Sequence, residues 1–145
     1  MMRKWMISLF AVSILLSGCS SEDDKATADK TPSTLTEVKV KFLTPEKNSN
    51  QTELLLQVEV TQGKEKIEDA TSVQFEIWPS GERKTNAQLV DAKYVENGIY
   101  EATAKVKADS VYYAYAHTEA RGLHVMPKQK FIIGQPDLNK VQTEK

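Results

Sequence analysis

The chain has 145 residues, of which 40% are hydrophobic and 27% are charged, so it is long enough for one globular domain and too short for two. Its formal net charge of −1 excludes the strongly basic balance of nucleic-acid-binding proteins, and no stripe of Lys and Arg with interleaved aromatic residues is present. We therefore expect a single domain whose partners do not include nucleic acid.

The N-terminus predicts export. A short positive segment, residues 1–4, precedes an apolar run of 12 residues, 5–16, which is shorter than the roughly 20 residues that a membrane-spanning helix needs. The run ends in LSGC, residues 16–19, which resembles the bacterial lipobox. Residues 1–18 are thus predicted to be a lipoprotein signal peptide, and the resemblance implies that Cys19 carries a diacylglyceryl group. An ordinary cleaved signal with an unmodified cysteine is the alternative.

Cys19 is the only cysteine in the chain. Once it is lipidated, no thiol remains for a disulfide or for a metal site, so the exported domain must be held together by packing. Each buried CH₂ of an acyl chain contributes about 0.8 kcal/mol, and two or more chains anchor a protein firmly. We therefore expect a partner in the lipid bilayer, reached through Cys19, and a location on the extracytoplasmic face of the bacterial cell membrane.

Polar segments flank the region that can form a core. The stretch SSEDDKATADKTPST, residues 20–34, has no aromatic residue and cannot bury enough apolar surface to order itself. We interpret residues 19–34 as the lipidated cysteine and a flexible tether, 35–134 as the folded domain, and 135–145 as a polar tail.

Within residues 35–134 the apolar side chains recur with a period of two, which is typical of half-buried strands. The sequence predicts strands at Val38–Phe42, Leu54–Val60, Val73–Trp78, Ala87–Val95, Ile99–Val106, Val111–Thr118 and Leu123–Ile133. Asn97-Gly98 between two of them predicts a tight hairpin, because both residues tolerate positive φ. About seven short strands favour a single immunoglobulin-like antiparallel β-sandwich, with a small open barrel as the alternative.

Three segments carry a family resemblance beyond the signal peptide and lipobox. They are residues 58–78, 94–106 and 116–134, of which the last is the most specific. Together they resemble the YtkA-like family, which is related to FixH-type proteins, over about residues 36–134. The resemblance implies a small extracytoplasmic β-sandwich in bacterial membranes, in a family with members associated with copper delivery during respiratory oxidase assembly.

Both histidines of the chain lie in the stretch AHTEARGLHVMP, residues 116–127. If Arg121-Gly122 is the centre of a two-residue turn, cross-strand pairing places Glu119 opposite His124. Two residues further along each strand, His117 then stands opposite Met126. All four side chains share one face, because side chains alternate along a strand. The candidate metal ligands are His117, His124, Met126 and Glu119.

The register of this hairpin decides whether a site exists. A four-residue loop preserves the pairing, whereas a three-residue loop with a bulge, which Pro127 could mark, would turn His117 and Glu119 to the other side. The face opposite the candidate ligands looks like core and carries Tyr112, Ala114, Ala116, Val125 and Phe131.

Two imidazoles and a thioether form a soft ligand set, which selects Cu(I) over magnesium or calcium. Glu119 could instead complete a zinc site with both histidines, or fix an imidazole tautomer from outside the ligand set. The alternative is that these are ordinary surface residues around a turn, with methionine serving in packing.

Aromatic residues raise further alternatives. Tyr112, Tyr113 and Tyr115 could form a platform for a sugar or a peptide, although such ladders are more often cross-strand packing. Trp78 falls on the outward side of its strand, where it could contact a partner, cover the sheet or do neither.

The sequence offers no catalytic motif, since G-x-S-x-G, S-x-x-K, H-E-x-x-H and a Gly-rich phosphate loop are all absent. We therefore expect binding and not catalysis. The preferred hypothesis is a Cu(I)-binding or copper-transfer domain that serves a membrane respiratory protein. The second hypothesis is a metal-free interaction module that contacts a membrane protein through an open sheet face.

Overall fold

The computed structural model of the protein describes residues 36–49 and 52–142. The predicted signal peptide, the predicted lipidation site Cys19 and the predicted tether lie outside the described residues, as do positions 143–145 of the polar tail. Within the described ranges, no helix is long and apolar enough to cross a membrane.

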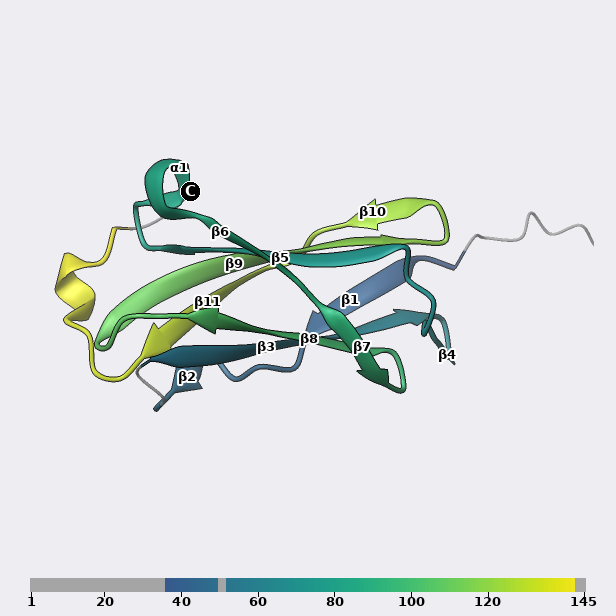
Figure 1. The fold of residues 1–145 in the computed structure, drawn as a ribbon, viewed down its shortest axis with the longest axis horizontal. Helices are drawn as coiled ribbons and strands as arrows, with labels where there is room; N and C mark the ends of the chain where they lie inside the picture. Colours follow the sequence, from purple (N-terminus) through teal and green to yellow (C-terminus); the bar gives the residue numbers. More distant parts are fainter. Residues whose placement is uncertain (1–35, 50–51, 143–145) are drawn as a thin grey trace, which may run out of the picture. The chain divides into compact units, whose positions relative to one another are not determined.

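Two β-sheets pack face to face as a sandwich (Figure 1). The five-stranded sheet has the order β1 (Val38–Phe42), β3 (Glu53–Gln62), β8 (Ile99–Lys105) and β7 (Lys93–Glu96), with β4 (Glu65–Lys66) paired to β3. The six-stranded sheet has the order β2 (Lys47–Asn48), β11 (Lys128–Ile133), β9 (Ser110–Ala120), β5 (Ser72–Pro79) and β6 (Gln88–Asp91), with β10 (Leu123–Val125) paired to β9. The strand pairs described are antiparallel except for β2 with β11. The predicted sandwich is confirmed, and the open barrel is not formed.

The core lies between the two sheets and follows the alternation of the sequence. On β3, the side chains of Leu54, Leu56, Val58 and Val60 are at most 1% exposed, and they point toward the other sheet. Phe75 of β5 and Phe131 of β11 close the core from that sheet, both at 0% exposure. On β9, β10 and β11, the side chains predicted as core are buried between the sheets, except that Val125 is partly buried.

The predicted strand Ala87–Val95 is broken in the structure. Its first half, β6, pairs with β5 in one sheet, and its second half, β7, pairs with β8 in the other. The break falls at Ala92, whose N–H donates to the carbonyl of Val73 over 2.9 Å. A strand that changes sheets must bend between them. The alternation of apolar and polar residues in the sequence runs through the break, so it gave no sign of the bend.

Two tight turns have positive φ at both central residues, as the sequence predicts for Asn97-Gly98 and allows for Arg121-Gly122. Asn97 and Gly98 have φ angles of 48° and 74°, and Arg121 and Gly122 have 52° and 73°. Positive φ at both central positions is the requirement of a type I′ turn. The second of these turns sets the geometry of the candidate site.

Short elements complete the domain. Helix α1 (Arg83–Asn86) follows β5, and the 3₁₀ helix η1 (Leu138–Lys140) lies in the tail. The described part of the tail lies against the domain, since Ser80 Oγ donates to the carbonyl of Gln142 over 2.8 Å. These elements are too short to leave a periodic pattern, so the sequence did not predict them.

Candidate functional site

The β9–β10 hairpin has the register of the two-residue turn, which is one of the alternatives that the sequence left open. Glu119 pairs with His124, and the neighbouring pairs on β10 follow the same register. On β11 the register continues without a shift, with Lys128 opposite Tyr115. The carbonyl of Pro127 accepts a hydrogen bond of 3.1 Å from the N–H of Ala116. The bulge considered at this proline is therefore absent, and Met126 stands opposite His117.

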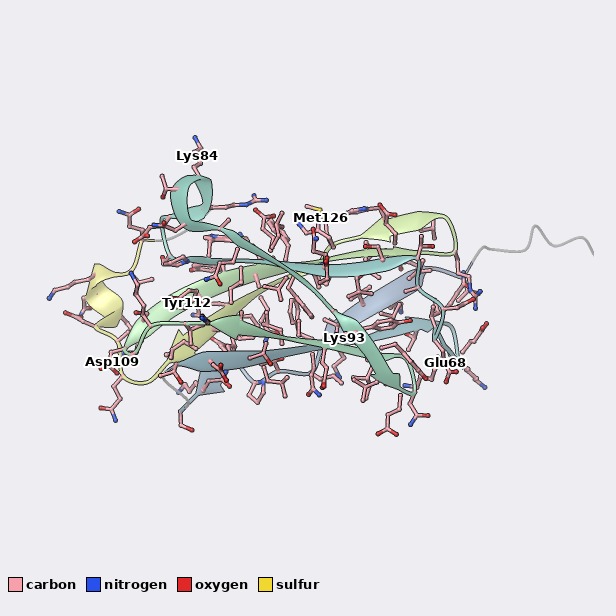
Figure 2. All side chains as sticks on the ribbon, viewed as in Figure 1. Glu68, Lys84, Lys93, Asp109, Tyr112 and Met126 are labelled. Atoms are coloured by element: carbon pink, nitrogen blue, oxygen red, sulfur yellow. The ribbon has the colours of Figure 1, made fainter. Side chains whose placement is uncertain are left out.

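The candidate ligands lie on the outer face of the six-stranded sheet. Along β9 the even-numbered side chains from Tyr112 to Ala120 are buried, whereas His117 is half-buried and Glu119 is exposed. Strand alternation thus places the histidine and the glutamate together on the side away from the core. Met126 is 44% exposed, and Figure 2 shows its side chain at the surface of this sheet.

The two imidazoles lie next to each other. The ring centroids of His117 and His124 are 5.7 Å apart, with an angle of 63° between the ring planes. With metal–nitrogen bonds of about 2.0 Å, two imidazoles on one metal have ring centres roughly 5–6 Å apart. The separation of the two rings is therefore within the range of a shared metal ion, and it is also that of a direct edge-to-face ring contact.

Glu119 lies at the edge of this pair. Its Oε1 is 3.8 Å from Nδ1 of His124, beyond hydrogen-bond range, and its side chain is 58% exposed. Among the described residues, no three His, Cys, Asp or Glu side chains are placed to hold a metal together. A third donor for the two imidazoles would then be the thioether of Met126, which is outside that set of residue types.

Glu76, on β5, is the residue of this site that the sequence did not reveal. Its Oε2 lies 2.9 Å from Nε2 of His117, and its side chain is only 15% exposed. Arg83 donates to both carboxylate oxygens, from Nε to Oε1 and from Nη2 to Oε2, each over 2.8 Å. The Arg83 hydrogen bonds, with a smaller contribution from His117, lower the pKa of the Glu76 carboxyl despite the opposing effect of burial.

Arg83 is itself held between two aromatic rings. Its guanidinium carbon is 4.8 Å from the ring centre of Trp78 and 4.7 Å from that of Tyr115. Trp78 is 0% exposed and packs against Tyr113 and Tyr115, with ring centroids 6.4 Å and 5.4 Å away. Trp78 is therefore a residue that covers the outer face of the sheet and not an exposed partner contact. Tyr113 and Tyr115 serve this packing, while Tyr112 belongs to the core.

The outer face thus carries one connected network. It runs from the aromatic layer of Trp78 through Arg83 and Glu76 to His117, and then to His124 by ring contact. Such a face can bind a soft cation at its imidazole end or a partner surface along its length. The β-sandwich thus carries a candidate site on the open outer face of one sheet.

The sequence matches the YtkA-like family over residues 33–117, which is more than half of the chain, and the protein belongs to this family. The match ends at His117, so His124 and Met126 lie beyond the matched segment.

No curated protein matches the sequence. Among solved structures, the sensor domain of the anti-sigma factor RsgI4 of Pseudobacteroides cellulosolvens is similar, with a TM-score of 0.47 and 12% sequence identity. The similarity covers 75% of this chain and 82% of that one. A resemblance this distant carries no information on function.

Proposed function

We propose that the protein is a non-catalytic binding domain that holds Cu(I) as cargo through His117, His124 and Met126. The single observation that supports this most is the separation of 5.7 Å between the two imidazole centroids on an open sheet face. Copper would be passed from here to a membrane respiratory oxidase during its assembly.

The chemistry of the donors favours copper in its reduced state. Imidazole suits several transition metals, but a thioether is a soft ligand that prefers Cu(I) to zinc. The side chains of His117 and His124 are 27% and 48% exposed, so an acceptor protein can reach a metal held between them. A partly exposed site suits transfer better than permanent storage.

The cellular location in the proposal depends on the sequence. The apolar run and the lipobox-like LSGC predict an anchor at Cys19 on the outer face of the membrane.

Membership of the YtkA-like family agrees with the copper hypothesis through the association noted for some of its members. No cysteine in the exported domain would compete for the metal.

Titration of the protein with Cu(I) against a competing chelator tests the proposal. We expect one copper per chain, with affinity lost in the His117→Ala/His124→Ala double variant and reduced in Met126→Leu. Leu89→Ala is the matched control, because Leu89 is 64% exposed and pairs with Glu76 on the same sheet. If the wild-type protein and the double variant are equally indifferent to copper, the proposal is wrong.

A second candidate function is a metal-free contact with a membrane protein. An open hollow of about 570 Å³ is lined by Trp78, Gly81, Arg83, Lys84, Thr85, Tyr115 and Lys128. The ring centroid of Tyr115 is 5.8 Å from that of His117. Arg83 is paired with Glu76, so Lys84 and Lys128 supply the positive charge that would fit an acidic partner surface. Indifference to copper, together with loss of partner binding in a Lys84→Glu/Lys128→Glu variant, would favour this function.

A further inference from the structure

We propose that Glu76 is a positioning residue that fixes the tautomer of His117, so that Nε2 carries the ring proton and Nδ1 is the nitrogen presented to a metal. The assignment of Nδ1 as a metal ligand rests on the proposed function. The assignment of the tautomer does not, because it follows from contacts of the protein alone.

The direction of the hydrogen bond determines the tautomer. The Nε2 atom of His117 is 2.9 Å from Oε2 of Glu76. An ionised carboxylate can only accept hydrogen bonds, so the proton between these atoms must belong to the imidazole. A neutral imidazole carries one ring proton, and with that proton on Nε2 the other nitrogen has its lone pair available.

Glu76 is held firmly enough to impose this choice. Two hydrogen bonds of 2.8 Å from Arg83 fix both oxygens of its carboxylate. The guanidinium is in turn placed between Trp78 and Tyr115, at 4.8 Å and 4.7 Å from their ring centres. A planar bidentate contact of this kind restricts the carboxylate in direction as well as in position.

The other histidine has no comparable support. His124 has a carboxylate near Nδ1, but Glu119 is 3.8 Å away and its side chain is 58% exposed. The two imidazoles are therefore unequal. His117 is oriented in advance by a half-buried network, whereas the carboxylate nearest to Nδ1 of His124 is beyond hydrogen-bond range.

A carboxylate that accepts from the distal nitrogen of a ligating histidine is a recurring feature of metal sites. It fixes the ring and raises the basicity of the nitrogen that binds, and its loss typically lowers metal affinity by about 10- to 100-fold. The contact between Glu76 and His117 joins β5 to β9. In the pairing of these two strands, Gln74 stands opposite His117. The sheet itself thus brings the orienting group to the ligand.

Nitrogen-15 NMR of the histidine rings in the metal-free protein, above the pH at which the rings are charged, tests the tautomer directly. In the wild-type protein we expect the Nε2–H tautomer at His117, with a slowly exchanging ring N–H resonance. In Glu76→Ala we expect averaged shifts from a mixture of tautomers and loss of that resonance. A proton on Nδ1 in the wild-type protein overturns the inference without any variant, as do identical spectra in the two proteins.

Asp91→Ala is the matched control. Asp91 is another carboxylate on the same face, where it accepts a hydrogen bond of 2.7 Å from Gln74 and not from a histidine. Its removal should leave the His117 ring resonances as they are. A backbone amide spectrum of each variant verifies that the sandwich is intact.

Copper titration separates this inference from the proposed function. We expect Glu76→Ala to weaken Cu(I) binding by about 10- to 100-fold and Asp91→Ala to leave it unchanged. If the wild-type protein binds copper and Glu76→Ala binds it equally well, the positioning role is overturned while the proposed function stands. If the wild-type protein does not bind copper, the proposed function fails, and the ring spectra still decide whether Glu76 fixes the tautomer.

Discussion

Nη2 of Arg121 lies 2.7 Å from Oε1 of Glu65, so the tip of the β9–β10 hairpin is tied to β4 of the opposite sheet. A second contact runs from Nη1 of the same side chain to Oδ2 of Asp69 over 3.0 Å. These ion pairs hold the end of the hairpin that carries His124. They lie at the surface, with 36% of the Arg121 side chain exposed and 61% of the Glu65 side chain.

Arg121→Ala should change stability little. Exposed ion pairs contribute about 0–1 kcal/mol because solvent screens them and two long side chains lose freedom. We expect the free energy of unfolding, measured in urea, to decrease by an amount within that range. This decrease should be smaller still in high salt. A loss of several kcal/mol that persists in high salt would contradict the assignment of these contacts as exposed, solvent-screened ion pairs.

Gly122→Ala should cost more than Arg121→Ala, although it removes no contact. A Cβ at this position would meet no atom within 4 Å, so there is space for the methyl group. The φ angle of 73°, however, is in the left-handed region, where an L-residue costs about 1–2 kcal/mol. Comparison of the two variants by urea unfolding separates backbone strain from side-chain contacts, and equal stability of Gly122→Ala and the wild-type protein would contradict this account.

The geometry of this hairpin was predictable because its determinants are local. Arg121 and Gly122 specify the turn, the turn specifies the register, and alternation then puts His117 and His124 on one face. Met126 follows from the same register, because Val125 and Lys128, which flank Met126 and Pro127, pair with β9 in one continuous register.

Glu76 was not predictable, since it is 41 positions away from His117 in the sequence. Its role depends on the pairing of β5 with β9 and on one particular register between them. Alternation indicated only that Glu76 and Trp78 share the outer face of their strand. Neither the strand partner nor the four-residue helix that places Arg83 over this face has a signal in local sequence. The burial of Trp78 depends on the same non-local contacts.

Tyr100→Phe should destabilise the domain substantially. The side chain is 4% exposed, and its hydroxyl donates to the carbonyl of Ile67 over 3.2 Å and accepts from the N–H of Ala70 over 3.0 Å. Loss of the hydroxyl leaves both backbone groups without this partner, which costs about 1–3 kcal/mol for a buried group. Tyr113→Phe keeps an aromatic ring in the packing around Trp78, and we expect a much smaller loss for it by urea unfolding.

The Tyr100 hydroxyl should also make stability fall at alkaline pH. Burial raises the pKa of this hydroxyl above its usual value, because the charged phenolate is poorly solvated there. A group whose pKa is raised on folding contributes its full stability below the unfolded value of about 10 and loses it as the pH rises through the folded value. The difference in unfolding free energy between the wild-type protein and Tyr100→Phe should therefore be constant up to about pH 9 and narrow above pH 10. A constant difference over the whole range would show that Tyr100 titrates alike in both states.

Arg83→Met should remove the stability that Glu76 contributes at neutral pH, so the difference in unfolding free energy between the wild-type protein and the variant should narrow in acid. In the folded protein, the Arg83 hydrogen bonds hold the pKa of Glu76 below its ordinary value. A carboxyl group with a lowered folded pKa stabilises the fold above its unfolded pKa of about 4.3 and loses that contribution as the pH falls through the folded value. Methionine keeps an apolar stem against Trp78 and Tyr115 but donates no hydrogen bond, so the Glu76 pKa should rise toward its usual range. Carbon-13 NMR of the carboxyl group measures this shift, and an unchanged Glu76 titration in the variant would contradict the role assigned to Arg83.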